Sequence, residues 1–403
     1  MTSPAKLSYY EFFAGVGMAR EGLENDWRCI WANDFDPKKA ETYTRNFGDA
    51  ELVVVDISRI RHSDLPEGAA LAWASFPCQD LSLAGNGGGI TAGRSGTFWA
   101  LWNIMKDMTN QRPPIIVLEN VVGLLKPDNF TALCEALASL GLQYGALLMD
   151  AKRFLPQSRP RVFVVAVDAR LDCREFYSLQ MPESVWINES VRNAYNALPE
   201  SLKARWRWWN LPGYTGEVQS VDQIIEDNPV GVEWNSDEET ERLLAMMTDI
   251  NRRKVNERLH LEKRSIGFLY KRTRNGQQRA EVRFDGIAGC LRTPKGGSSR
   301  QSVVIIENGE VRTRLLSPRE LARLMGMPER FVLPNEYNDA YMAMGDGIAV
   351  PCVSWLSEML LAPLARSILQ AEPSPACGVS EIIEVHLRNS EDMARRWGNI
   401  VNA

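Results

Sequence analysis

Short apolar runs alternate with segments of helical periodicity over residues 6–167. The first run passes through a glycine turn into a helical start at 18–25, and a longer helical pattern covers 96–108. We expect the apolar runs to be strands, at residues 6–13, 29–35, 51–57, 71–76, 113–121 and 161–167. Strands this apolar are typical of a sheet that is covered on both faces. The pattern therefore predicts an α/β fold with a mostly parallel, doubly wound sheet.

The pattern changes after residue 185. Long apolar runs become few, helical periodicity is clear at 237–259, and the rest of this stretch reads as irregular structure. Further on, residues 317–328 predict a short amphipathic helix, and a glycine turn leads into a long apolar helix over 341–369 that suits packing on the first domain. We divide the chain into a larger first domain at 1–185, a smaller irregular domain at 186–312, a returning segment at 313–370 and a tail at 371–403.

Charge is distributed unevenly along the chain. The formal net charge of -5 argues against a nucleic-acid-binding protein when the chain is taken as a whole. Residues 251–330, however, hold 19 Lys and Arg against 8 Asp and Glu, while residues 217–249 hold ten acids and one Arg. We interpret this split as one face that meets a polyanion, with a polar, helix-rich surface as the alternative. Trp206, Trp208 and Trp209 are expected in the core of the small domain, with stacking on DNA as the alternative.

The amino-acid composition further limits the classes of protein to which the chain can belong. The seven cysteines form no CxxC pair, and three histidines give no zinc-ligand spacing, so we expect neither a disulfide framework nor a metal site. No apolar run approaches the roughly 18 residues that a membrane helix needs. The first residues also lack the regions of a signal peptide. We therefore expect a cytoplasmic protein with no membrane partner.

A glycine turn and two acids mark a candidate cofactor site. Phe13, Gly15 and Gly17 lie at a predicted strand-to-helix turn, where glycine lets the backbone approach a ligand. Asp34 ends the second predicted strand and Asp56 the third, so both carboxyl groups should reach the same sheet edge. They would suit a ribose diol and the amine of adenine. A turn of this kind also occurs for packing alone, and dehydrogenases share it, so the cofactor stays open at this point.

Four further residues follow strands on the same edge. Cys78 stands in a long glycine-rich loop, Glu119 ends an apolar run, and Arg159 and Arg161 lie two residues apart. Singly, each has a structural explanation: a thiol packs, a strand-end acid caps a helix, and an Arg pair forms surface ion pairs. Together at one sheet edge, where ligands bind, they favour a reactive site.

Eight segments of the chain resemble, in order, the motifs of the DNA (cytosine-5) methyltransferases. They span residues 9 to about 360 and leave a variable stretch where that family has its target recognition domain. The resemblance implies a Rossmann-like class I S-adenosylmethionine-dependent methyltransferase fold. The segments are FFAGVGMAREGLE, NDFD, VVVDI, FPCQDLS, LENV, QSRPRVFVV, RLLSPRELARLMGMPE and GDGIAVP.

The resemblance also implies roles for individual residues. Cys78 matches the nucleophile, Glu119 the acid that contacts N3 and the 4-amino group of cytosine, and Arg159 and Arg161 the arginines that orient the base. Thr293 resembles the threonine that closes the recognition domain. The matches to residues that bind S-adenosylmethionine are Phe13, Gly15, Gly17, Asp34, Phe35, Asp56, Pro77 and Asp346. Asp346 replaces the family's usual Asn, and an Asp accepts hydrogen bonds but cannot donate one from an amide.

The function implied by the resemblance is methyl transfer from S-adenosylmethionine to C5 of a cytosine flipped out of a specific double-stranded DNA sequence, through a covalent bond from Cys78 to C6. It further implies a monomer on DNA in a microbial restriction-modification system, with a restriction endonuclease as genetic partner. Two alternatives are an RNA (tRNA) cytosine-5 methyltransferase and a catalytically silent DNA-binding regulator. A nicotinamide dehydrogenase is a more distant one. The recognised DNA sequence depends on loop geometry that composition does not reveal.

Overall fold

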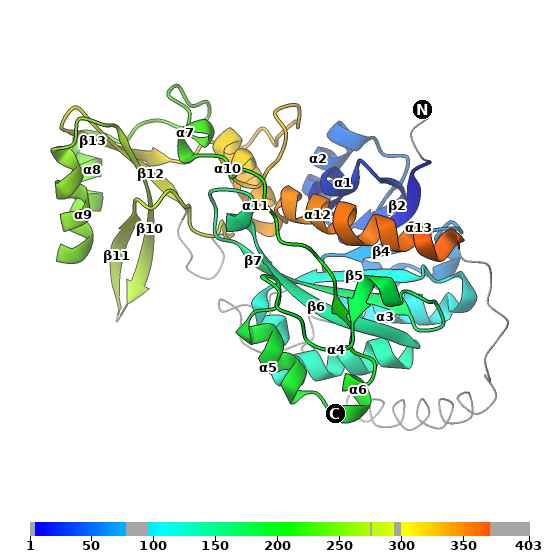
Figure 1. Cartoon of the computed structure of the whole chain (residues 1–403). Coiled ribbons are helices and arrows are strands. Elements are labelled where there is room, and N and C mark those ends of the chain that lie inside the picture. Colours follow the sequence, from blue (N-terminus) through cyan, green and yellow to red (C-terminus); the bar gives the residue numbers. More distant parts are fainter. Residues whose placement is uncertain (1–4, 78–95, 275, 294–299, 371–403) are drawn as a thin grey trace.

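The computed structural model describes residues 5–77, 96–274, 276–293 and 300–370. Its larger part is built on a seven-stranded sheet of order β3-β2-β1-β4-β5-β7-β6 (Figure 1). All neighbouring strands are parallel except β7, which runs antiparallel to both β5 and β6. The expected mostly parallel sheet is therefore confirmed. The strands are β1 (Leu7–Phe12), β2 (Trp27–Asp34), β3 (Leu52–Val54), β4 (Leu71–Ala74), β5 (Ile115–Asn120), β6 (Leu142–Asp150) and β7 (Pro160–Asp168).

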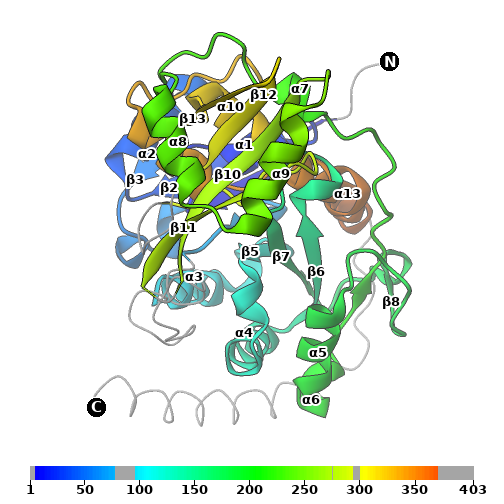
Figure 2. The same cartoon turned by 90° about the vertical axis from the view of Figure 1, so that its left-hand side faces the viewer.

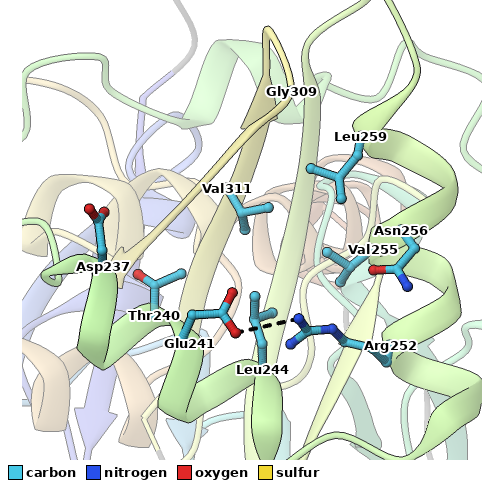
Figure 3. A pocket seen from close by; sticks show the side chains of 10 residues that line it. All are labelled: Asp237, Thr240, Glu241, Leu244, Arg252, Val255, Asn256, Leu259, Gly309 and Val311. Atoms are coloured by element: carbon cyan, nitrogen blue, oxygen red, sulfur yellow. Dashed lines mark hydrogen bonds and ion pairs between the residues drawn. The ribbon is translucent and has the colours of Figure 1, made fainter.

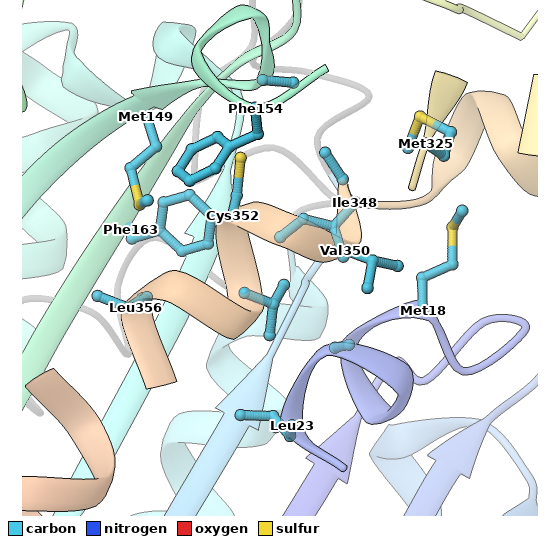
Figure 4. Close-up of a cluster of buried hydrophobic side chains, with 14 of the residues drawn as sticks. Met18, Leu23, Met149, Phe154, Phe163, Met325, Ile348, Val350, Cys352 and Leu356 are labelled. Carbon is cyan, nitrogen blue, oxygen red and sulfur yellow. The ribbon is translucent and has the colours of Figure 1, made fainter. Parts of the chain in front are cut away.

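Helices cover both faces of this sheet, as predicted. One face carries α1 (Met18–Leu23), α2 (Pro37–Phe47), α12 (Val350–Leu356) and α13 (Ala362–Gln370), and the other carries α3 (Gly96–Asp107) and α4 (Pro127–Ser139). Because side chains alternate along a strand, Tyr9 packs into the first core and Tyr10 into the second. Figure 4 shows the first core, where α1 and α12 meet the sheet.

The long apolar segment near the end of the described chain belongs to this first core. Tyr337–Gln370 is long and apolar enough to cross a membrane by composition alone. However, 67% of its most apolar window is buried inside the protein. A short π-helical stretch, Ser357–Leu361, joins α12 to α13, and Trp27 Nε1 donates to Ser357 Oγ there at 2.9 Å. The segment is therefore explained as a core helix.

The smaller part of the molecule contains a regular sheet that the sequence did not predict. Four antiparallel strands lie in the order β11-β10-β12-β13. Two helices pack on one face, around Leu244, Val255 and Val304 (Figure 2). The periodic stretch 237–259 is these two helices rather than one. The elements are β10 (Ser265–Arg274), β11 (Gln277–Arg283), β12 (Ser302–Glu307), β13 (Glu310–Leu315), α8 (Asp237–Ala245) and α9 (Asp249–Leu259).

The first part of the range expected for the small domain packs on the large sheet instead. It forms α5 (Glu189–Ala197), α6 (Glu200–Lys203) and the short strand β9 (Trp208–Trp209), which pairs with β8 (Tyr177–Ser178). Trp206 and Trp208 are buried in the second core of the large sheet, and Trp209 in the first. Neither the small-domain core nor DNA stacking is therefore their environment.

The two parts are joined by a fully buried ion pair. Arg314 Nη2 and Glu320 Oε1 lie 2.7 Å apart, with both side chains inaccessible to solvent. Glu320 belongs to α10 (Pro318–Leu324), which begins with a capping box at Ser317. This helix lies within the range 317–328 in which a helix was predicted. Glu226 closes the network, since its carboxylate accepts from Ser317 Oγ at 2.6 Å and its carbonyl accepts from Arg314 at 2.8 Å. It follows α7 (Val221–Ile224).

Candidate active site

The turn between β1 and α1 is held open by its glycines. Phe13, Gly15 and Gly17 have φ angles of 58°, 58° and 86°, in the left-handed region. A side chain at Gly17 would collide with Phe47, so this glycine is required for packing. A Cβ at Gly15 would meet no atom of the described residues within 4 Å, so this part of the chain leaves the space above the turn open. The turn therefore offers its backbone to a ligand at the carboxyl edge of the sheet.

Asp34 fixes that turn from the neighbouring strand. Its side chain is buried, and its two oxygens accept from the backbone N–H groups of Gly15 and Asp36, at 2.8 and 2.9 Å. The adjacent Phe35 is 66% exposed, which is unusual for an aromatic side chain. The carboxylate is thus oriented beside an exposed ring, an arrangement that fits a ribose next to a flat base.

Asp56 stands one strand further along the same edge. Its carboxylate accepts from Ser58 N at 2.8 Å and Ser58 Oγ at 2.6 Å, and these hydrogen bonds lower the pKa of Asp56 below its ordinary value. Asp34 and Val54 are partners in the register of β2 and β3, so Asp56 and Phe35 leave adjacent strands at the same edge. Val54 is half exposed. An apolar surface flanked by carboxylates results, which fits an adenosine.

Glu119 and Arg161 form an ion pair at the other end of the edge. Arg161 Nε lies 3.2 Å from Glu119 Oε1, and the two side chains are 15% and 9% exposed. Burial raises the pKa of the Glu119 carboxyl, whereas the guanidinium groups of Arg161 and Arg159 and a hydrogen bond with Ser75 oppose that rise. Glu119 is therefore an acid whose proton is retained more readily than usual, held in one orientation by Arg161.

The strand end before Cys78 is held beside Glu119. Asn120 Nδ2 donates to the carbonyl of Phe76 at 3.1 Å, which joins the end of β5 to the chain that leaves β4. Pro77, expected to contact cofactor and base, follows directly and is half-buried. Cys78 itself lies outside the described residues. Asn120, which binds the Phe76 carbonyl, and Ser75, which forms a hydrogen bond with Glu119, were not predicted as site residues from the sequence.

Arg159 binds backbone carbonyls from two distant segments. Its side chain is 1% exposed and donates from Nη1 to Leu291 O at 2.7 Å and from Nη2 to the carbonyls of Gly345 and Gly347. Gly345 in turn lies against Thr293, where an added Cβ would be 3.0 Å from the Thr293 nitrogen. The two arginines thus differ: Arg161 faces the acid, and Arg159 ties the returning chain to β7.

Asp346 ends α11 (Tyr337–Asp346) and forms an ion pair with Lys39 of α2, with 3.0 Å between Nζ and Oδ2. Neither Lys39 nor Cys290 was predicted as a site residue from the sequence. Cys290 is a partly buried thiol 3.6 Å from Arg159 Nη1. Burial opposes ionisation of Cys290, but the nearby arginines outweigh it and lower the pKa of the thiol.

Two cavities lie apart from these residues. One of about 300 Å³ lies in the small domain between α8, α9 and β13, where Arg252 pairs with Glu241 (Figure 3). A second, of about 770 Å³, lies between Ile57 and α3. Neither is lined by Glu119, Arg161 or Asp34.

Within the described ranges, no group of three or more His, Cys, Asp or Glu side chains could hold a metal ion.

The strand order, the glycine turn and the acids at the strand ends agree with the Rossmann-like fold of class I methyltransferases. Residues 7–361 match the family described as C-5 cytosine-specific DNA methylase, and the chain belongs to this family. It is a DNA (cytosine-5) methyltransferase.

Named relatives and solved structures are similar to the chain over most of its length. Type II methyltransferase M.BsuFI of Bacillus subtilis is 28% identical over 353 residues, which cover 86% of this chain and 71% of that protein. Type II methyltransferase M.HpaII of Haemophilus parainfluenzae is 26% identical, with 90% and 91% covered. The structure of Entamoeba histolytica methyltransferase EhMeth has a TM-score of 0.62 at 14% identity, with 89% and 99% covered. That of S. pombe Dnmt2 methyltransferase has a TM-score of 0.54 at 19% identity and the same coverage. At these identities the structures support the fold alone.

Proposed function

We propose that the chain transfers a methyl group from S-adenosylmethionine to C5 of a cytosine flipped out of a specific double-stranded DNA sequence. Cys78 is the nucleophile in this proposal, and its sulfur bonds to C6. One observation carries it: the Glu119–Arg161 pair stands on the sheet edge that also carries Gly15 and Asp34. A base-binding acid and a nucleoside-binding turn thereby share one edge.

The cofactor part of the proposal rests on fit. Asp34 would receive the ribose hydroxyls, Asp56 the adenine amine, and Phe35 and Val54 the faces of the purine. The free space above Gly15 leaves room for the backbone to approach the ligand. When bound, S-adenosylmethionine supplies an electrophilic methyl group on a sulfonium.

The residues at the other end act on the base. The Cys78 thiolate adds to C6, which breaks the aromaticity of the ring and makes C5 a nucleophile. Glu119 holds a proton at N3 and stabilises the charge that develops on the ring, while Arg161 keeps its carboxyl in place. After C5 is methylated, a base removes the C5 proton, the C6–sulfur bond breaks, and the electron pair returns to the thiolate.

DNA is the partner that the charge distribution supports. The basic window at 251–330 includes the strands of the small domain, where Arg272 of β10 is 54% exposed. Such a surface grips phosphates, so affinity should fall steeply with salt. Flipping the cytosine costs a few kcal/mol of stacking. Because named relatives are type II methyltransferases, we propose a microbial restriction-modification role with a cognate endonuclease, in the cytoplasm, and action as a monomer.

A covalent trap tests this proposal. Double-stranded DNA that contains 5-fluorocytosine, incubated with S-adenosylmethionine and the protein, should give a complex that survives denaturing electrophoresis. Cys78→Ala should give none, while Cys134→Ala, which removes a buried thiol of α4, should still give it. The recognised sequence would come first from bisulfite sequencing of DNA from cells that express the chain. Trapping of tRNA but not DNA would favour the RNA alternative, and no trapping of either would overturn the mechanism.

A further inference from the structure

Lys39 stands among acidic groups at the proposed cofactor edge. It lies in the first turn of α2, five residues after Asp34, and its ammonium donates to Asp346 Oδ2 at 3.0 Å. The two side chains are 25% and 41% exposed, so the pair is only partly screened by water. Lys39 thus connects the helix that follows the ribose-binding strand to the end of α11.

The charges around Lys39 keep it protonated. Burial opposes its ammonium, but Asp346, Asp34 and Asp36 outweigh burial and raise the pKa of Lys39. Asp34 is buried and already accepts two backbone N–H groups. Without Lys39 this edge would present three carboxylates together. An anionic group of a ligand would then be repelled.

The chemistry of the cofactor makes this repulsion relevant. Its amino-acid portion carries a carboxylate, and an amide at position 346 could donate a hydrogen bond to such a group. The carboxylate of Asp346 cannot donate. Lys39 has three N–H donors, of which Asp346 takes one. It can therefore neutralise Asp346 and still offer a donor and a positive charge.

We propose that Lys39 is a cofactor-binding residue of this chain, whose ammonium receives the methionine carboxylate of S-adenosylmethionine while it stays paired with Asp346. The inference rests on the proposed use of that cofactor. In this arrangement the Lys39–Asp346 pair takes the place of a single amide side chain. It specifies the amino-acid end of the ligand, whereas Asp34 and Asp56 specify the nucleoside end.

The adjacent lysine provides a matched control. Lys38 lies on the same helix turn and pairs with Asp339 of the same helix α11, also at 3.0 Å. Its side chain is 71% exposed, and its charged neighbours are Asp339, Asp36 and Glu336 rather than Asp34 and Asp346. Loss of Lys38 therefore removes a contact between α2 and α11 without touching the proposed carboxylate site.

Equilibrium binding to two ligands tests the proposal. Calorimetry would compare S-adenosylmethionine with its decarboxylated analogue, which keeps the sulfonium and nucleoside. Lys39→Met should weaken binding of S-adenosylmethionine by about ten-fold or more, because a hydrogen bond to a charged group is lost. Binding of the decarboxylated ligand should be unchanged or tighter. Lys38→Met should keep both affinities within about two-fold.

Two further variants make the outcome decisive. Lys39→Arg should retain most of the affinity, and Lys39→Met combined with Asp346→Asn should regain part of it, because the carboxylate no longer needs neutralising. The assignment of Lys39 would be overturned if Lys39→Met, with the melting temperature of the parent, lost affinity equally for both ligands. It would also be overturned if that variant lost affinity for neither ligand. If the unaltered protein binds neither ligand, the proposed cofactor is wrong instead.

Discussion

The two ends of the proposed active edge are built in different ways. The proposed cofactor end comes from consecutive units of the chain, since Gly15 lies in the turn after β1, Asp34 ends the adjacent strand β2, and the two are joined by a hydrogen bond of 2.8 Å. The proposed base end brings together β5, the start of β7 and, through Arg159, the carbonyls of residues 291, 345 and 347. The first end is set by local turns, while the second depends on long-range packing. Substitutions should therefore have confined effects at the first end and wider effects at the second.

Removal of the acid at Glu119 should give the largest effect on activity. Glu119→Gln keeps the shape but cannot carry the acidic proton, so we expect turnover to fall about 10²- to 10⁴-fold. Affinity for S-adenosylmethionine should stay within a few-fold. Asp168→Asn is the matched control, because Asp168 is another buried acid paired with an Arg but lies at the opposite edge of the sheet. Methyl transfer from a labelled donor measures both, and turnover of Glu119→Gln within ten-fold of the parent would contradict the role.

Loss of the Arg159 side chain should disturb both ends. Arg159→Met leaves buried carbonyls of Leu291, Gly345 and Gly347 without a donor, and we expect the free energy of unfolding to fall by about 3 kcal/mol. Urea denaturation measures this. Cofactor binding and covalent trapping should both weaken, since Gly347 adjoins Asp346. A variant that loses trapping alone, with unchanged stability, would show that Arg159 acts on the base instead.

The pH dependence of stability should report on the cofactor end. Burial raises the pKa of Glu11 to about 8, with Asp34 adding to the rise and Arg20 and Tyr43 opposing it. Since the folded state holds this proton more tightly than the unfolded chain, the associated stability is present below about pH 4.5 and is lost as the pH rises through 8.

Glu11→Gln should remove that dependence. Its melting temperature at pH 9 should therefore move closer to its value at pH 6 than the parent's does. Glu51→Gln, which alters another partner of Arg20, is the control for the ion-pair contact. Identical pH profiles for the parent and Glu11→Gln would show that Glu11 does not govern this loss.

The smallest effect should come from the exposed ring at the cofactor end. Phe35→Ala should weaken S-adenosylmethionine binding by about three- to ten-fold, through lost stacking. Stability should change by less than about 0.5 kcal/mol, because Phe35 is 66% exposed. Calorimetry and thermal unfolding measure the two. A loss of stability with intact binding would mean that Phe35 serves packing.

Local patterns explain why much of the large sheet could be predicted. The strands β4, β5 and β7 are mostly apolar, β1 and β2 contain apolar runs, and the acids at the strand ends marked the proposed active edge. The strand β6 was missed because Gly145 and polar residues interrupt it, yet Gly145 is required, since a side chain there would collide with Arg207 O. In β11 charged residues alternate with apolar ones, and in β10 a short apolar run is followed by KRTR, so neither stands out as a long apolar strand.

The contacts of Arg159 could not be predicted in the same way. Its partners are backbone carbonyls more than a hundred residues away in the chain, and a carbonyl leaves no signal in the sequence. From the sequence, Glu119 and Arg161 were expected only at the same sheet edge. Their ion pair depends on the antiparallel register of β5 and β7, which the sequence did not reveal. The ion pair of Lys39 depends on how α11 returns to α2. The sequence therefore predicted which residue types meet, but not which atoms.

The buried pair between Arg314 and Glu320 has a consequence for protein engineering. Both charges are inaccessible to solvent, and both residues contact Glu226. A chimaera junction between them could therefore leave one buried charge without its partner. A chimaera that borrows its DNA specificity from another enzyme should thus exchange residues 226–320 as one cassette. Junctions placed inside that span should yield insoluble protein, however well the recognition strands are matched.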